Sequence, residues 1–155
     1  MIRKALAGCM LLAAPALTFG QGNVLSVEPP QLFTAKVGTT VEAKLMLRLM
    51  PGYHVNSNTP SDPYFIPLRL TWKPGQLEPG EVVYPKPRME KYSFSDKPLS
   101  VFSGNFELVA KFKVPANANP GPANVTGTLR YQACNDSMCL APKNIEVPLR
   151  VAIVR

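Results

Sequence analysis

The chain has 155 residues, a length that suits one domain rather than two. Its formal net charge of +7 comes from 17 lysines and arginines set against 10 aspartates and glutamates. These basic residues are scattered, with no cluster and no interleaved aromatic residues, which argues against a nucleic-acid-binding protein.

The N-terminal segment has the organisation of a secretion signal. A basic start at Arg3 and Lys4 is followed by an apolar core over residues 5–17 and then by small residues that suit a signal peptidase. The sequence therefore predicts a signal peptide over residues 1–20 and an exported mature domain over residues 21–155. The apolar core is too short for a stable membrane anchor, which takes about 20 residues.

A lipid-modified N-terminus is the alternative, because residues 6–9 end in Cys9 and resemble a lipoprotein processing box. Such a box follows the apolar core, whereas most of the core here comes after Cys9. We therefore expect export without a lipid anchor, and mass spectrometry of the mature N-terminus distinguishes the two. Removal of Cys9 with the signal leaves Cys134 and Cys139 as an even pair in an oxidising compartment.

Beyond the signal, the chain shows the period-two alternation of half-buried strands and no helical periodicity of useful length. The clearest alternation covers residues 41–50, 106–114, 125–131 and 145–153. Shorter candidates cover residues 23–30, 32–37, 68–72 and 81–84, and another starts at residue 101. Pro148 falls on the polar face of the last strand, which predicts an exposed edge there. The 17 prolines and 10 glycines that separate these short strands favour an all-β fold, an immunoglobulin-like β-sandwich.

Two stretches between the strands attract attention. Tyr92 and Phe94 are isolated aromatic residues in the polar stretch 89–98, which predicts a loop with apolar side chains to bury. Cys134 and Cys139 lie at the junction of the last two strands, where the Asn-Asp-Ser segment between them favours a turn. The sequence therefore presents the cysteine pair at one end of the sandwich.

The residue types exclude most enzyme templates. His54 is the only histidine, so a histidine-rich zinc site cannot form within one chain, and the few acidic residues are dispersed. No glycine-rich phosphate loop or nucleophile elbow occurs, and we expect neither a metal site nor a cofactor. For His54 we expect a structural, hydrogen-bonded role. A copper(I) site that joins it to the thiols and a methionine, as in a metal carrier, is the alternative.

Cys134 and Cys139 leave two interpretations open on the residues alone. The pair either performs reversible thiol–disulfide exchange or forms a purely structural disulfide in a secreted binding or adaptor domain. The loop that they close has about six residues, for which chain entropy predicts only roughly 2 kcal/mol of stabilisation. A domain of this size buries enough apolar surface to fold without that bond.

Two motifs resemble a known family. Residues 131–142 read YQACNDSMCLAP, and residues 51–58 read PGYHVNSN, followed by Pro60 and by residues 65–67, which read FIP. In this order they resemble the periplasmic N-terminal domain of the thiol:disulfide interchange protein DsbD, and the likeness covers nearly all of the mature chain. The resemblance implies an immunoglobulin-like periplasmic domain that takes electrons from a membrane-embedded partner and gives them to oxidised secreted proteins.

The resemblance also implies roles for named residues. As the second cysteine, Cys139 forms the mixed disulfide with a partner, and Cys134 resolves it. A cap loop over residues 90–98 covers the pair, with Phe94 as its expected tip and Tyr92 as the second choice, and it shields the sulfurs from unselective oxidation until a partner displaces it. The expected partners are thioredoxin-like redox proteins and a separate membrane protein that donates electrons.

Overall fold

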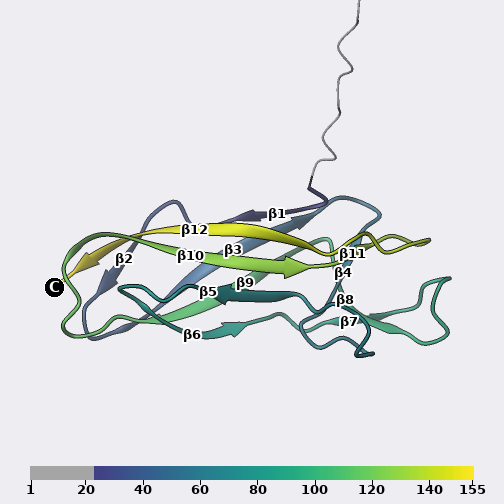
Figure 1. Ribbon diagram of the computed structural model, residues 1–155, viewed down its shortest axis with the longest axis horizontal. Helices are drawn as coiled ribbons and strands as arrows, with labels where there is room; N and C mark the ends of the chain where they lie inside the picture. Colours follow the sequence, from purple (N-terminus) through teal and green to yellow (C-terminus); the bar gives the residue numbers. More distant parts are fainter. Residues whose placement is uncertain (1–22) are drawn as a thin grey trace, which may run out of the picture.

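Twelve strands in three sheets build the part of the chain that the computed structural model describes, residues 23–155 (Figure 1). No helix occurs between these residues, so none there is long and apolar enough to cross a membrane. The predicted signal peptide over residues 1–20, with Cys9, lies outside the described range. The all-β fold class predicted from the alternation is confirmed.

The first sheet is antiparallel throughout and has the order β1-β3-β9-β6. Its strands are β1 (Leu25–Glu28), β3 (Thr40–Leu49), β9 (Asn105–Lys113) and β6 (Glu78–Val83). The ladder between β3 and β9 is regular from Thr40 opposite Lys113 to Arg48 opposite Asn105. β6 begins at Glu78, earlier than the predicted strand. Its pairing with β9 shifts register between Pro79 and Val82, and this irregularity breaks the alternation that would have revealed the first residues of the strand.

The second sheet has the order β2-β12-β10-β5. Its strands are β2 (Phe33–Lys36), β12 (Lys143–Val154), β10 (Gly121–Tyr131) and β5 (Arg69–Trp72). β10 and β12 form a long antiparallel ladder, whereas β2 pairs in parallel with β12 only from Val151 to Val154. No other described strand pairs with β12 on the side of β2, so Pro148 lies at a free edge, as its position predicts.

The third sheet is small and has the order β11-β4-β8-β7. Its strands are β11 (Ala133–Cys134), β4 (His54–Asn56), β8 (Leu99–Ser103) and β7 (Arg88–Glu90). Only β8 among them is predicted by the sequence pattern, because strands of two or three residues are too short to show alternation. The start of the predicted loop 89–98 is therefore strand, and the loop itself begins after Glu90.

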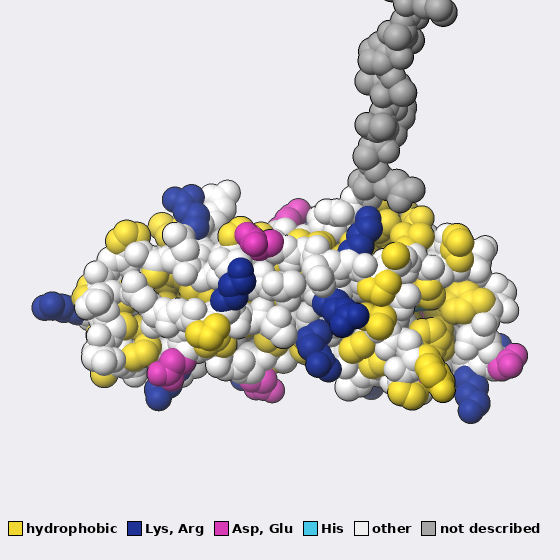
Figure 2. Space-filling view, viewed as in Figure 1, with side chains coloured by type: hydrophobic (Ala, Val, Ile, Leu, Met, Phe, Trp, Pro, Cys, Tyr) yellow, Lys and Arg dark blue, Asp and Glu magenta, His cyan; other side chains and the backbone are white. Residues whose placement is uncertain are grey.

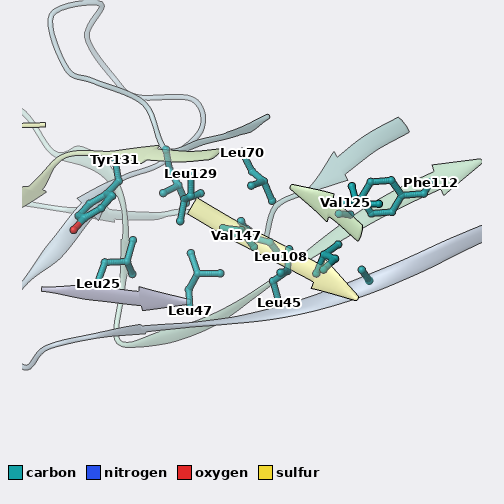
Figure 3. Close-up of a cluster of buried hydrophobic side chains, with 14 of the residues drawn as sticks. Leu25, Leu45, Leu47, Leu70, Leu108, Phe112, Val125, Leu129, Tyr131 and Val147 are labelled. Carbon is teal, nitrogen blue, oxygen red and sulfur yellow. The ribbon is translucent and has the colours of Figure 1, made fainter. Parts of the chain in front are cut away.

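The first two sheets contribute to one hydrophobic core (Figure 3). Leu45, Leu47 and Leu108 of the first sheet share this cluster with Leu129 and Val147 of the second. The alternation of buried and exposed positions along β3 and β10 follows the period-two pattern of the sequence. Burial of these two inner faces is what makes the fold a sandwich.

A tight contact fixes the edge strand β5 on the second sheet. Trp72 lies across Gly127, where an added Cβ atom would come within 2.6 Å of the indole ring. The same ring meets Phe112 edge to face, with ring centroids 5.0 Å apart. A glycine is therefore required at position 127 so that the indole can lie flat against β10.

The third sheet and its loops lie at the end of the molecule opposite the C-terminus, at the right of Figure 1. Figure 2 shows hydrophobic side chains gathered at this same end. Large apolar residues that are exposed in the third sheet and its adjoining loops are Met50, Tyr64, Met89, Phe94 and Met138. The sandwich therefore presents an apolar surface beside the cysteine pair.

Candidate functional site

Cys134 and Cys139 form a disulfide in the structure. Cys134 is the last residue of β11 and has 0% exposed surface, whereas Cys139 is half-buried. The two residues also face each other as an isolated antiparallel bridge. Of these two cysteines, only Cys139 is exposed to solvent.

An asparagine builds the turn between the cysteines. The side-chain oxygen of Asn135 accepts hydrogen bonds from the backbone N–H groups of Ser137 and Met138, both at 2.9 Å. The backbone N–H of Asn135 donates to the carbonyl oxygen of Met138, also at 2.9 Å. The turn predicted from the Asn-Asp-Ser segment is thus confirmed.

The register of the third sheet places His54 beside the disulfide. β4 pairs with β11 so that His54 lies opposite Cys134 and Val55 lies opposite Ala133. Val55 and Ala133 belong to the hydrophobic core, and successive residues of a strand point to opposite faces. His54 and Cys134 therefore share the face that points away from the core, where opposite Cβ atoms are about 4.5–5.5 Å apart.

Aromatic rings from the loop after β7 cover His54. Tyr92 stacks on the imidazole with centroids 3.9 Å apart and an angle of 18° between the planes. Phe94 lies 5.6 Å from Tyr92 and 6.4 Å from His54, nearly parallel to both rings. Tyr92 is half-buried and Phe94 is 37% exposed, so Phe94 is the more exposed ring and lies beside the stacked pair of Tyr92 and His54.

A few hydrogen bonds hold this loop in place. The Tyr92 hydroxyl donates to Glu90 Oε2 at 2.6 Å, and the Ser103 hydroxyl of β8 donates to Glu90 Oε1 at 3.1 Å. The Ser93 hydroxyl donates to the carbonyl oxygen of Asp136 in the cysteine turn at 2.7 Å. The carboxylate of Glu90 thus ties the loop to β8, and Ser93 ties it to the turn between the cysteines.

His54 lacks the hydrogen bond that the sequence interpretation expects of it. It is 2% exposed, and its Nε2 atom has no hydrogen-bond partner in the part of the chain that the structure describes. The expectation fails because the ring plane is set by stacking on Tyr92 rather than by a polar neighbour. Burial lowers the pKa of His54, and the nearby carboxylates of Glu90 and Asp136 offset part of that shift. The imidazole is therefore mainly neutral at pH 7.

Burial also raises the pKa of Tyr92, and its hydrogen bond to the Glu90 carboxylate and the charges of Glu90 and Asp136 raise it further. Tyr92 consequently remains a neutral hydrogen-bond donor across the physiological pH range. The charged groups around the stack are the two carboxylates, which act on both rings.

A hollow of about 510 Å³ opens beside the stacked rings. Residues that line it include Met50, Tyr53, His54, Glu90, Tyr92 and Asp136. Among the residues that the structure describes, no group of three histidine, cysteine, aspartate or glutamate side chains is placed to hold a metal ion. His54 and both carboxylates thus line one hollow.

Sequence reasoning identified the cysteines and both aromatic residues of the loop, and the structure brings them to one end of the sandwich. It missed Glu90 and Ser103, which hold the loop, because neither belongs to a recognisable motif. It also missed the closeness of His54 to Cys134, which depends on the register of two strands that the pattern does not predict.

Comparison with known proteins places this arrangement in a family. Residues 21–150 match the family model described as the N-terminal domain of the thiol:disulfide interchange protein DsbD. The chain belongs to the DsbD N-terminal domain family. The family resemblance predicted from residues 51–58 and 131–142 is thereby confirmed. No curated protein matches the sequence significantly.

A solved structure with a similar fold supports the architecture of this DsbD N-terminal family member. The N-terminal periplasmic domain of ScsB from Proteus mirabilis superposes with a TM-score of 0.59 at 14% identity, over 86% of this chain and 49% of that one. The chain thus spans about half the length of the ScsB structure. PapD-like domain 7 of human CEP192 gives a TM-score of 0.43 at 12% identity, over 96% of this chain and 98% of that one. The immunoglobulin-like fold is confirmed.

Membership of the DsbD N-terminal domain family indicates a periplasmic thiol–disulfide exchange module. The disulfide between Cys134 and Cys139 is the one feature of the described residues with the chemistry for such an exchange.

Proposed function

We propose that this domain passes reducing equivalents to oxidised periplasmic proteins through Cys134 and Cys139. In the proposal, residues 1–20 direct export and are removed, and residues 21–155 form the working domain. A separate membrane protein reduces the pair, and thioredoxin-like proteins with a disulfide receive the electrons. The observation that carries the proposal is the unequal exposure of the two cysteines beneath a loop attached by few bonds.

The unequal exposure of the two cysteines supports a different step for each. In the reduced domain, the Cys139 thiolate attacks a partner disulfide, forms a Cys139–partner bond and releases one partner thiolate. Cys134 then attacks the Cys139 sulfur, closes the internal disulfide and releases the second partner sulfur. Two electrons and two protons thereby pass from the cysteine pair to the partner. The buried Cys134 is shielded from outside attack, which suits a resolving role.

The loop over residues 91–98 acts in this proposal as a displaceable cap. Tyr92 and Phe94 cover the face that His54 shares with Cys134, and the hydrogen bonds of Glu90 and Ser93 hold the loop closed. A partner that offers an apolar surface at this end of the molecule replaces the contacts of Phe94 and moves the loop aside. The exposed side chain of Met138 extends the same surface.

Replacing Phe94 with alanine is expected to speed reduction of the disulfide by dithiothreitol about 2–10-fold, because one aromatic pair contributes about 0.5–1.5 kcal/mol to closure. Stopped-flow measurement of the reduction rate provides the check. Tyr64→Ala is the matched control, since Tyr64 is an exposed aromatic residue that belongs to no described stack of rings. Equal reduction rates for Phe94→Ala and the wild type would contradict the proposal that Phe94 limits access to the disulfide.

Equilibration of the domain against glutathione buffers of known potential tests the proposed function. We expect the Cys134–Cys139 bond to equilibrate with a midpoint less negative than about −300 mV, the range of exchange-active disulfides. A midpoint below about −300 mV would instead favour the secreted binding or adaptor domain with a purely structural disulfide. The oxidised and reduced forms can be counted by alkylation and mass spectrometry.

A further inference from the structure

A buried nitrogen atom next to the cysteine pair has no use in the steps above. His54 is 2% exposed, and within residues 23–155 its Nε2 atom neither donates nor accepts a hydrogen bond. A buried polar atom without a partner costs about 1–3 kcal/mol, so its presence in a folded protein needs a reason. The state described here is the disulfide, in which Cys134 carries no proton to share.

Reduction of the disulfide supplies the missing partner. Cys134 lies opposite His54 in the ladder between β11 and β4, and both side chains are on the face turned away from the core. A thiol formed on Cys134 is a hydrogen-bond donor within the span of one cross-strand pair. We propose that His54 Nε2 accepts the proton of the Cys134 thiol and so acts as the base of the resolving step.

This inference rests on the proposed exchange function and adds a proton path to it. Once Cys139 is joined to the partner, the Cys134 thiol gives its proton to His54 Nε2. The resulting thiolate attacks the Cys139 sulfur, the internal disulfide forms, and the bond between Cys139 and the partner breaks. The partner sulfur leaves as a thiolate, and the imidazolium returns its proton to that thiolate or to water.

The surroundings of His54 suit a base that works near neutral pH. Burial keeps the imidazole unprotonated and ready to accept a proton at pH 7. The groups that face it are Tyr92 from the cap, Glu90 from β7, Asp136 from the cysteine turn and Cys134 from β11. The two carboxylates stabilise the imidazolium once it forms, and Tyr92 holds the plane of the ring.

The hollow beside the stack gives the proton an exit. His54, Glu90 and Asp136 all line this space of about 510 Å³. Because the pKa of His54 is lowered from 6.5, the base is fully available above that pH and is lost as the pH falls through the lowered value. The rate of the resolving step should therefore show an inflection on the acid side of pH 6.5, whereas capture of the partner falls with the thiolate fraction of Cys139 and shows no inflection from His54.

The test separates the two steps with oxidised glutathione as the probe. In the wild type, release of the second glutathione reports attack by Cys134, whereas in Cys134→Ser the reaction stops at the mixed disulfide and reports capture alone. We expect His54→Gln to slow the release about 10²-fold at pH 7 and to remove the inflection below pH 6.5, so that the rate falls steadily with the thiolate fraction of Cys134, since general-base catalysis contributes about 10²–10⁴-fold. Capture in the double variant with Cys134→Ser should change less than about threefold.

Two further measurements separate chemistry from structure. Val55→Ala alters the same strand from its core side, so it should lower stability without changing the pH dependence of the release. His54 is the only histidine, so NMR titration of its imidazole in the wild type needs no variant at position 54. We expect its titration in the reduced protein to change when Cys134 is replaced by serine.

The outcomes distinguish the two levels of the proposal. If the wild type and His54→Gln release glutathione at the same rate with the same pH profile, His54 is not the base of the resolving step. The proposed exchange function is unaffected by that result. An imidazole titration that is identical in the reduced wild type and in reduced Cys134→Ser would also overturn the base. If the wild type forms no mixed disulfide at all, the proposed exchange function is wrong. The role of His54 as its base is then wrong as well.

Discussion

Replacing Cys139 with serine is expected to abolish disulfide exchange with a thioredoxin-like protein, whereas replacing Cys134 with serine is expected to halt the exchange halfway. The half-buried Cys139 is the sulfur that a partner can reach, and the fully buried Cys134 is the one that must release the partner. Cys134→Ser should therefore accumulate a mixed disulfide through Cys139. Non-reducing electrophoresis followed by mass spectrometry of the linked peptides checks both results.

The two substitutions control for each other. Each removes the same disulfide, and so each loses the same stabilisation of roughly 2 kcal/mol from the short loop. Equal losses of stability, measured by urea unfolding, would show that a contrast in trapping comes from the chemistry of the remaining sulfur. A complex trapped through Cys134 in the Cys139→Ser protein, or no complex with either variant, would contradict the assignment of roles.

Replacing Phe112 with alanine is expected to lower the free energy of unfolding by about 3–5 kcal/mol, a large share of the total for a domain of this size. Phe112 is completely buried, and its ring supports Trp72 at a centroid distance of 5.0 Å. Removal of the ring leaves a cavity between the sheets and takes away the support of the indole. Urea unfolding followed by the fluorescence of Trp72, the only tryptophan, measures the loss.

Phe94→Ala is the matched control for this prediction, because it deletes the same side chain from a position that is 37% exposed. We expect a loss of about 1 kcal/mol or less, since Phe94 is partly exposed and its two aromatic contacts, with Tyr92 and His54, are long. Similar losses of unfolding free energy in the two variants would contradict the view that the core determines stability whereas the cap controls access to the disulfide.

The long strands of the fold are predictable because each alternates for seven or more residues, so the inward and outward faces are legible in the sequence. β3, β9, β10 and β12 all lie where the alternation indicates. The strands β4, β7 and β11 were beyond reach, because two or three residues define no period. All three residues of β4 are buried, so this strand has no exposed polar face that alternation could reveal.

The site was predictable in its chemistry and not in its geometry. Residue type and the turn chemistry of Asn135 point to the cysteine pair, and the family resemblance points to the aromatic loop. The stacking of Tyr92 on His54, rather than on the disulfide itself, depends on where β7 delivers the loop. Cross-strand partners such as His54 and Cys134 are more than 70 residues apart, and no local pattern encodes their register.

The free edge of β12 has a consequence for how the domain meets other protein chains. An open strand edge is a template on which a second chain can add its own strand, the first step towards fibrous aggregates. Pro148 has no N–H group to offer such a strand, and the charged side chains of Lys143, Glu146 and Arg150 lie along the same stretch. The free edge of β12 is thus poorly suited to pair with a strand of a neighbouring chain.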